Sequence, residues 1–301
     1  MGGIKMKVVM NEFLKYLRDK NSAKNTIASY ERDILRFIKY FKNKEKDTYF
    51  LTTEDMQDYL TILEEEGKSN STISRVTASI KAYYKFLSTK NLVEKNPAKN
   101  IKSYKVEKKE LSILTKSEIQ KLLNEATCED LKGKRDEAML QLLYATGMRV
   151  TELISLKIAD VNLSAGKIKI IKAGTTRYIV LNNSTVRYVK HYIKEIRPLL
   201  CKIDTDETLF LNSNGKKLTR QGFWKILKKY KNSANIEKEL TPHTLRHSFA
   251  VHNLSDGMDI KKLQEILGHT DVATTMMYNE FIEDNSITDE INEFNSDINL
   301  V

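Results

Sequence analysis

Apolar residues recur at helical spacing through the N-terminal third of the chain and predict four amphipathic helices. The first covers Asn11–Lys20, and the second begins at Asn25-Thr26. The third begins at Thr52-Thr53-Glu54-Asp55, where carboxylates are favourable beside a helix N-terminus. The fourth follows Ser69 and places six apolar residues on one face: Ile73, Val76, Ile80, Tyr83, Tyr84 and Leu87. The pattern therefore predicts a helical N-terminal domain over residues 1–96.

A stretch with little periodicity follows this domain. Residues 97–111 carry five lysines: Lys99, Lys102, Lys105, Lys108 and Lys109. Such a segment is typical of an interdomain linker, either simply solvated or lying along a phosphate backbone. We interpret it as a basic linker.

The pattern becomes periodic again near Thr115, where Glu118 stands at the capping-box position. Helices are predicted at about 116–126, 134–146, 183–197, 219–233, 242–256 and 259–267. Between them Lys167–Ile171 alternates, Ala173-Gly174-Thr175 supplies a turn, and Arg177–Leu181 returns as a second strand. Thr208–Leu211 fits a further short strand or a loop. The fold class is therefore mainly α, with a small antiparallel β-sheet in a second domain over residues 112–279.

Charge divides the chain unevenly. The net charge is +10 and the pI about 9.2. From Glu280 to Val301 there are seven acidic residues and no Lys or Arg, so residues 1–279 hold all 50 basic residues against the remaining 33 of the 40 acidic ones. A strongly basic body suggests a polyanionic partner, although a lysine-rich solvated surface would look the same. The acidic tail is read as a segment of its own.

Composition also excludes several classes of protein. The chain has no run of about 20 apolar residues, so no membrane span is expected. Its N-terminus lacks the apolar stretch of a secretory signal. Cys128 and Cys201 show no Cys-x-x-Cys spacing, which argues against a zinc site or a disulfide framework. We therefore expect a cytoplasmic protein without a bound metal.

The first candidate constellation is Pro242-His243-Thr244-Leu245-Arg246-His247. Thr241 is a good N-cap, and His243 and Arg246 lie on one helical face near the N-terminus, where an anion is welcome. A capping role alone would explain the same residues. His247 is expected to pack the helix against its neighbours.

Two further constellations flank it. Gly147-Met148-Arg149 ends one helix and opens the next, with Glu152 three residues on; a surface Arg–Glu pair of little energetic value is the plain alternative. Leu267-Gly268-His269 is followed nine residues after His269 by Tyr278. A single tyrosine near the end of a domain is usually a packing residue.

In combination these motifs resemble a known family. Gly-x-Arg-x-x-Glu-Leu, a hairpin lysine, His-x-x-Arg, Leu-Gly-His and a tyrosine nine residues after that histidine occur in this order. Together they are similar to the active site of the tyrosine recombinases, the λ-integrase family, and most closely to its bacterial Xer subgroup. The N-terminal helices, with Lys24-Asn25-Thr26, resemble the SAM-like core-binding domain of that family.

The resemblance implies roles for individual residues. Tyr278 would be the nucleophile that forms a 3′-phosphotyrosyl link, and Arg149 and Arg246 would grip the phosphate oxygens. His243 would be the general base and His269 a hydrogen-bond donor to the phosphate or an aid to proton transfer. Two supporting positions complete the set: Lys172 as the acid for the leaving 5′-oxygen, and Glu152 as the group that orients Arg149 or a histidine.

The hairpin departs from the family pattern, which usually reads Gly-Lys-Gly around the lysine. Here the lysine stands in Ile171-Lys172-Ala173, with Gly174 one place later, and Val180 replaces the usual proline. Lys172 keeps the spacing to Arg177, while Lys169 is an alternative.

DNA contacts are also expected outside the active site. In the N-terminal domain we expect phosphate contacts. In the second domain the segment starting at Thr219 resembles a DNA-facing segment of the family. The predicted contact residues are Lys24, Asn25, Thr26, Arg75, Lys81, Arg220 and Gln221.

The implied activity is site-specific recombination through a four-way junction, without a metal, ATP or other cofactor, in a homo-tetramer or in a hetero-tetramer with a related recombinase. An Xer-like role in resolving chromosome or plasmid dimers is favoured. Integration or excision of a phage or transposon, and a non-catalytic DNA-binding architectural protein, are the alternatives. Residues 280–301 would dock on a neighbouring subunit, or serve only as a solubilising tail.

Overall fold

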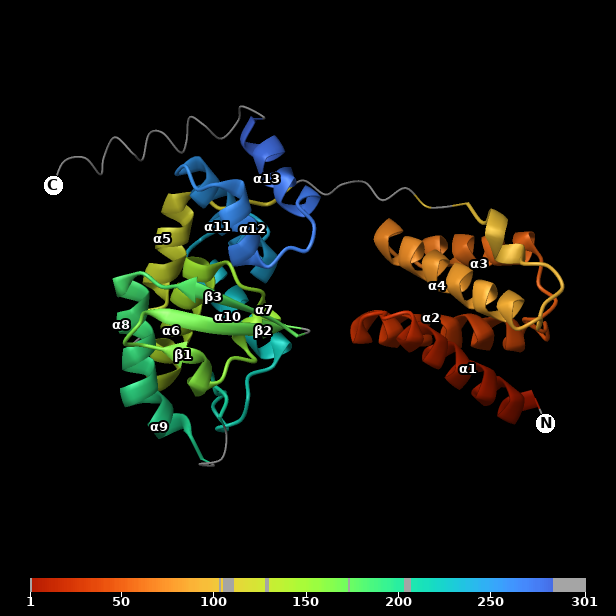
Figure 1. The fold of residues 1–301 in the computed structure, drawn as a ribbon, viewed down its shortest axis with the longest axis horizontal. Coiled ribbons are helices and arrows are strands. Elements are labelled where there is room, and N and C mark those ends of the chain that lie inside the picture. The colour runs from red at the N-terminus through yellow and green to blue at the C-terminus, as the bar shows by residue number, and fades with distance from the viewer. Residues whose placement is uncertain are drawn as a thin grey trace. The chain divides into compact units, whose positions relative to one another are not determined.

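A computed structural model describes residues 2–102, 104, 111–127, 130–172, 174–202 and 207–283. The chain divides into two compact units, Met1–Lys109 and Glu110–Val301 (Figure 1). Each has its own apolar core, and the two are described separately.

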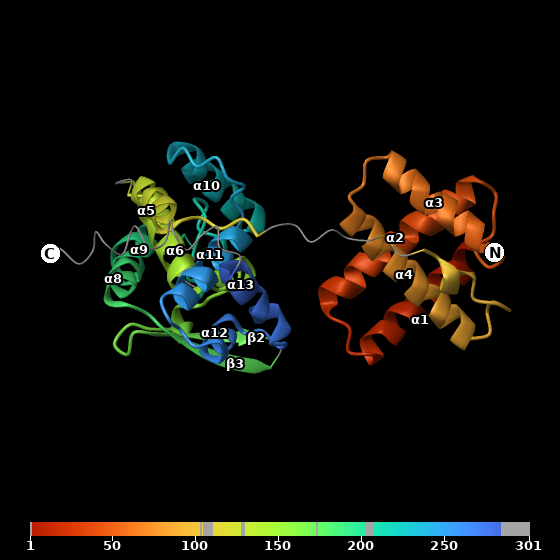
Figure 2. The ribbon, with the colours of Figure 1, turned by 90° about the horizontal axis from the view of Figure 1, so that it is seen from above.

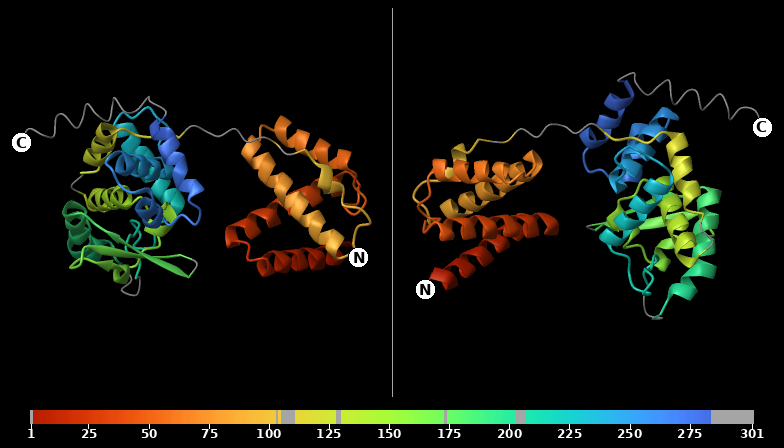
Figure 3. Two further views of the ribbon diagram at one scale, coloured as in Figure 1. Left: turned by 45° about the horizontal axis from the view of Figure 1, so that its top comes forward. Right: turned by 180° about the vertical axis from the view of Figure 1, so that it is seen from behind.

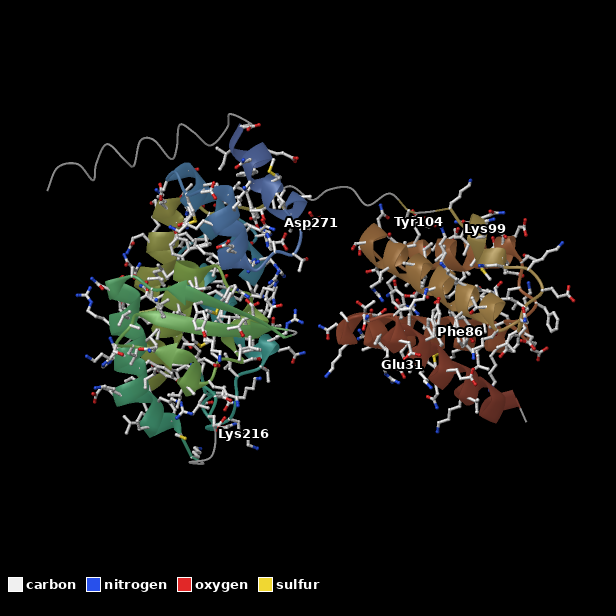
Figure 4. The ribbon with its side chains drawn as sticks, in the orientation of Figure 1. Glu31, Phe86, Lys99, Tyr104, Lys216 and Asp271 are labelled. Atoms are coloured by element: carbon white, nitrogen blue, oxygen red, sulfur yellow. The ribbon has the colours of Figure 1, made fainter. Side chains whose placement is uncertain are left out.

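Within the described residues, the first unit is built from four α-helices (Figure 3). They are α1 (Gly2–Asp19), α2 (Lys24–Asn43), α3 (Thr53–Glu65) and α4 (Asn70–Thr89). The predicted apolar face of α4 is buried, and Phe86, labelled in Figure 4, packs its ring against Phe13 of α1 at 5.6 Å. Thr52 forms the capping box expected at the start of α3, with Asp55. The predicted helical N-terminal domain is confirmed, and α1 begins earlier than the apolar pattern indicated.

The start of the predicted linker belongs to this first unit. Pro97–Asn100 forms a 3₁₀ turn, η1, and the Thr53 hydroxyl donates a 2.8 Å hydrogen bond to the Pro97 carbonyl. Ala98 and Ile101 are buried in the helical core. The first residues of the predicted linker therefore pack on this unit, because the apolar side chains of Ala98 and Ile101 hold the turn on the helices. Residues 105–110 lie outside the described part of the chain.

The second unit is mostly helical. Its helices are α5 (Lys116–Glu125), α6 (Leu131–Thr146), α7 (Val150–Leu153), α8 (Asn183–His191), α9 (Arg197–Leu200), α10 (Arg220–Ser233), α11 (Pro242–Ser255), α12 (Ile260–Leu267) and α13 (Ala273–Glu283). A 3₁₀ turn, η2 (Ile158–Asp160), precedes the sheet, and a π-helical turn, η3 (Tyr192–Ile196), joins α8 to α9. The predicted helix 183–197 is thus helical throughout, with a π-helical turn inside it, and it continues to Leu200.

A three-stranded antiparallel sheet in the order β1-β2-β3 accompanies the helices. Its strands are β1 (Val161–Asn162), β2 (Lys167–Lys172) and β3 (Thr175–Val180). Ile168 pairs with Ile179, and both are buried, whereas Tyr178 and Val180 of β3 are 63% and 68% exposed. One face of the sheet therefore packs on the helices and the other is solvated (Figure 2). The mainly α fold with a small sheet is confirmed; β1 was not predicted.

Thr208–Leu211 forms no strand. Thr208 makes an isolated bridge to Lys157, and Leu209, Phe210 and Leu211 are fully buried. The segment is a core-packed loop, one of the two outcomes expected for it.

Helix α13 continues past the predicted start of the tail at Glu280. It ends at Glu283, and Phe281 and Ile282 pack against a cluster formed by α11, α12 and α13. These two apolar residues therefore belong to the second unit. Residues 284–301 lie outside the described part of the chain.

Candidate active site

Two helix ends capped by glycine form the base of the site. Helix α6 ends at Gly147 and α12 at Gly268, both in the left-handed conformation, with φ of 57° and 63°. A Cβ at Gly147 would collide with the ring of Phe249, and one at Gly268 would come within 2.8 Å of Arg177 Nη1. Only glycine suits both the backbone angle and the crowding here. The carbonyl groups left without helical partners at these ends point into the site.

Arg246 is held by both of these helix ends. Its Nη1 donates to the Gly147 carbonyl at 2.7 Å, and its Nη2 donates to the Leu267 carbonyl at 2.8 Å. The residue is almost fully buried. Burial, with Arg149 nearby, lowers the pKa of Arg246 to about 10, so the guanidinium stays charged at neutral pH. A buried cation at the negative ends of two helices is electrostatically favourable.

Arg149 lies beside it. Its Nη1 donates to the same Leu267 carbonyl at 3.4 Å and to Glu152 Oε1 at 3.5 Å. Arg149 is the N-cap of α7, and its backbone N–H donates to Glu152 Oε2 at 2.8 Å. The structure thus brings the two predicted arginines together on one carbonyl oxygen.

Glu152 has a second partner that the sequence analysis missed. Arg177 of β3 forms a bidentate pair with it, at 3.1 Å from Nη1 to Oε1 and 2.8 Å from Nη2 to Oε2, and donates from Nε to the Ile266 carbonyl at 2.9 Å. Burial would raise the pKa of Glu152, but the hydrogen bonds from Arg177 and from the Arg149 backbone, with both charges, lower it overall. Arg177 therefore ties β3 to α7 and to the end of α12. The sequence feature that could have indicated this role is the position of Arg177 in the second predicted strand of the hairpin. In the structure Arg177 pairs with Ile170 of β2.

His269 follows Gly268 directly and contacts Arg246. Arg246 Nη2 lies 2.8 Å from His269 Nε2, and Thr275 Oγ1 lies 2.9 Å from Nδ1. A guanidinium can only donate, so Nε2 accepts and Nδ1 carries the proton that is donated to Thr275. Burial, with Arg246 and Arg149 nearby, lowers the pKa of His269 to about 4, in agreement with a neutral ring.

Tyr278 lies on α13 and is 1% exposed. Its hydroxyl is 2.9 Å from His247 Nδ1, and its ring stacks on His269 with centroids 6.5 Å apart. Burial raises the pKa of Tyr278, while Arg246 and Arg149 act in the opposite direction. The residue predicted as nucleophile and the two predicted phosphate-binding arginines are therefore electrostatic neighbours. Asp271, labelled in Figure 4, lies in the loop between α12 and α13.

His243 is exposed at the start of α11, where Thr241 caps the helix and accepts from the His243 and Thr244 N–H groups. Its ring stacks on His247 with centroids 6.2 Å apart. Burial lowers the pKa of His243, and Arg246, Arg149 and Arg220 lower it further. Arg220, the first residue of α10, is thus close enough to act on the site electrostatically.

The remaining predicted residues lie on β2, α2, α4 and α10. Lys172 ends β2 opposite Thr175, and its backbone is what the structure describes. In the first unit Lys24, Asn25 and Thr26 open α2. Arg75 of α4 forms an ion pair with Asp33, which also accepts from Ser79 at 2.8 Å. Lys81 is also on α4, and Gln221 follows Arg220 on α10.

Comparison with known proteins identifies the family. The phage integrase family model matches residues 112–283, and the model of the phage integrase N-terminal SAM-like domain matches residues 10–91. The chain is a member of the phage integrase family. This membership makes it a tyrosine recombinase, an enzyme that cleaves and rejoins DNA at specific sites, and the sequence prediction of family and activity is confirmed.

Individual relatives agree. The chain is 40% identical over 276 residues to the tyrosine recombinase XerD of Staphylococcus epidermidis, covering 91% of this chain and 94% of the relative. XerD of Oceanobacillus iheyensis is 39% identical, with 91% and 93% covered. The Tn1549 transposon integrase in complex with transposon right end DNA has the same fold, with a TM-score of 0.72 at 21% identity and coverage of 96% and 98%. The recombinase described here is thus most similar to the Xer group.

None of the helices in the described ranges is long and apolar enough to cross a membrane.

Proposed function

We propose that Tyr278 is the nucleophile of this recombinase. Its oxygen attacks a DNA phosphorus, a 3′-phosphotyrosyl bond forms, and the bond to the 5′-oxygen breaks. The observation that carries the proposal is the convergence of Arg149 and Arg246 on one carbonyl oxygen, with Tyr278 buried beside them. Two guanidinium groups fixed in this way suit the charge that develops on phosphate oxygens in the transition state.

In this proposal His243 and His269 act at the phosphate. His269 Nε2 accepts from Arg246 in the free protein, so donation to a phosphate oxygen requires a proton on Nε2. An anion bound beside the ring favours the protonated form and supplies the reason for that change. His243 is exposed on α11 and stacks on His247, and it would act at the phosphate or in the transfer of protons near it.

Lys172 is the proposed acid for the leaving 5′-oxygen. Position 172 has the same strand parity as Ile168 and Ile170, which are buried, and pairs with Thr175, two residues from Arg177. The competitor Lys169 pairs with Tyr178, which is 63% exposed on the solvated face of the sheet. Strand register therefore favours Lys172.

Substrate DNA is a polyanion, and the strongly basic residues 1–279 suit its binding. For contacts outside the site we propose Lys24, Asn25 and Thr26 at the start of α2, Arg75 and Lys81 on α4, and Arg220 and Gln221 at the start of α10. The first residues of a helix offer free N–H groups and the positive end of the helix dipole to a phosphate. This supports the proposed contacts at the starts of α2 and α10. The Arg75 guanidinium already pairs with Asp33, so it would contact a phosphate while keeping that ion pair.

We also propose that four subunits assemble on DNA, as a homo-tetramer or with a related recombinase, and exchange strands through a four-way junction. The Xer relatives support resolution of chromosome or plasmid dimers over integration of a mobile element. Mapping the bound DNA in cells tests this role: one palindromic site near the replication terminus supports it, and binding to element ends contradicts it.

A suicide substrate tests the chemistry. In a duplex nicked close to the cleavage site, the short fragment that carries the released 5′-hydroxyl diffuses away, and wild-type protein should be trapped as a covalent adduct on the remaining 3′-phosphate. Tyr278→Phe should abolish the adduct and retain DNA binding. Failure of the wild-type protein to form an adduct would instead support the architectural, DNA-binding alternative.

Deletion of residues 284–301 tests the proposed docking of the tail on a neighbouring subunit. This segment carries five acidic residues and no basic ones, with Ile287, Ile291 and Phe294 among them. We expect weaker synapsis of two DNA sites and an unchanged melting temperature of the free protein. Unchanged synapsis would leave only a solubilising role for the tail.

A further inference from the structure

The hydrogen bond between Tyr278 and His247 gives the nucleophile a partner outside the predicted set. Within the described residues, the Tyr278 hydroxyl lies 2.9 Å from His247 Nδ1, with ring centroids 5.6 Å apart. His247 had been expected only to pack α11 against its neighbours. In the structure its Nδ1 touches the oxygen that would attack the phosphate.

The environment of His247 keeps its ring neutral, so Nδ1 can accept a hydrogen bond. Burial, with the charges of His243 and Arg246, lowers the pKa of His247 to about 4. The groups around it are His243 and Arg246 on its own helix, Tyr278 on α13, and His269, which follows α12. No carboxylate stands among these four. A phenol is the stronger donor and a neutral imidazole nitrogen the stronger acceptor, so the bond runs from the Tyr278 O–H to Nδ1.

We propose that His247 is a further catalytic residue, the group that takes the Tyr278 proton as the phenolic oxygen attacks. This inference rests on the proposed role of Tyr278 as nucleophile. In the step, the O–H bond of Tyr278 breaks and its proton moves to Nδ1, while the oxygen bonds to phosphorus. The 5′-oxygen leaves and takes a proton from the acid, for which Lys172 is proposed. When the strand is rejoined, the proton returns from Nδ1 to the phenol.

Geometry favours His247 over His243 for this step. His243 stands on the exposed side of His247, and their rings stack at 6.2 Å. A general base must lie within hydrogen-bond reach of the proton that it removes, and His247 meets this requirement in the resting protein. His243 then serves the phosphate or passes the proton on from His247.

Two substitutions separate proton transfer from positioning. In His247→Asn the amide oxygen is bonded to Cγ, as Nδ1 is in histidine, so it can still accept from Tyr278 but cannot hold the proton. His247→Ala removes both functions. If His247 is the base, both variants should slow formation of the suicide-substrate adduct by a factor of about 10² to 10⁴. If it only positions Tyr278, the Asn variant should cleave nearly as fast as wild type, which would overturn the proposal.

The pH dependence of cleavage gives a second, independent measurement. Without the base, reaction depends on the phenolate already present, so the cleavage rate of His247→Asn should rise about tenfold per pH unit between pH 7 and 9, well below the tyrosine pKa near 10. The wild-type rate should be nearly flat there. A packing defect would lower the rate equally at every pH, and that result would contradict the proposal.

Matched controls keep the outcomes distinct. His191→Asn, on the exposed end of α8, should cleave at the wild-type rate. A 5′-bridging phosphorothiolate needs no acid for its leaving group, so it should rescue Lys172→Ala and fail to rescue His247→Asn. Faster cleavage by His247→Ala would show that the contact restrains Tyr278 and would overturn the inference. Absence of a wild-type adduct would refute the proposed nucleophile instead.

Discussion

At the scale of single residues, Glu152 has the largest discrepancy between sequence and structure. Its spacing from Arg149 alone fitted a surface pair of little value, whereas the family resemblance implied a group that orients Arg149 or a histidine. In the folded chain its side chain is 7% exposed and accepts a fork from Arg177, whose side chain is 14% exposed. Removing one member of such a pair leaves a buried charge without compensation, which is much costlier than losing a solvated pair.

Arg177→Met should therefore destabilise the protein strongly. We expect the free energy of unfolding in a urea titration to fall by about 3–5 kcal/mol, because Glu152 stays buried without its fork. Lys157→Met is the matched control: it breaks a pair with Glu207 whose side chains are 58% and 71% exposed, and should leave the free energy of unfolding nearly unchanged. Equal losses in the two variants would contradict the role given to Arg177.

At the scale of elements, helix ends organise the site. The C-termini of α6 and α12 supply the carbonyl groups that hold Arg246 and Arg149, and the N-terminus of α11 supplies His243. The reactive groups therefore stand on the rigid ends of helices, and Arg177 of β3 fixes one of those ends by its bond to the Ile266 carbonyl. Catalytic groups mounted on rigid elements lose little entropy when the substrate binds.

Thr241→Ala should damage both the helix and the reaction. The Thr241 hydroxyl accepts from the His243 and Thr244 N–H groups at 3.1 and 3.0 Å, and loss of such a cap costs about 1 kcal/mol. We expect a lower melting temperature and slower cleavage, since fraying of the first turn displaces His243. Thr241→Ser keeps the oxygen and should restore both properties. If cleavage by the Ala variant is unchanged, the first turn of α11 does not position the site.

At the scale of the whole molecule, buried histidines couple stability to pH. Burial is the first cause in each of three cases, His247, His252 and His269, and the pKa of each falls to about 4. The unfolded chain binds protons at these positions below a pH of about 6.5, and the native protein does so only below about 4. Stability must therefore fall as pH drops through this interval, because the unfolded state binds more protons there.

His252 allows this coupling to be measured away from the proposed chemistry. It is buried on α11, with its Nδ1 2.8 Å from the Tyr144 hydroxyl. His252→Asn keeps a polar atom near that hydroxyl and removes the titration. The loss of unfolding free energy between pH 7.5 and 4.5 should shrink by about 1–3 kcal/mol in this variant. A pH dependence of His252→Asn equal to that of the wild type would refute the assignment.

The sequence by itself determined the elements and the family. Apolar periodicity located the four N-terminal helices, and capping residues such as Thr115 and Thr241 marked helix starts, because both signals act over a few residues. Five short motifs in a fixed order identified a tyrosine recombinase. The catalytic roles assigned to Arg149, Lys172, His243, Arg246, His269 and Tyr278 stay predictions.

Only the tertiary structure decided which partners these residues have. Arg177 and Glu152 are 25 residues apart in the chain, and His247 and Tyr278 are 31 apart, so no local periodicity connects them. Their contacts arise when β3 and α13 pack against helix ends from other parts of the second unit. Burial then fixes the charge states, since an apolar environment keeps His247 neutral and makes Glu152 depend on Arg177. These long-range contacts and their desolvation cannot be read from spacing along the chain.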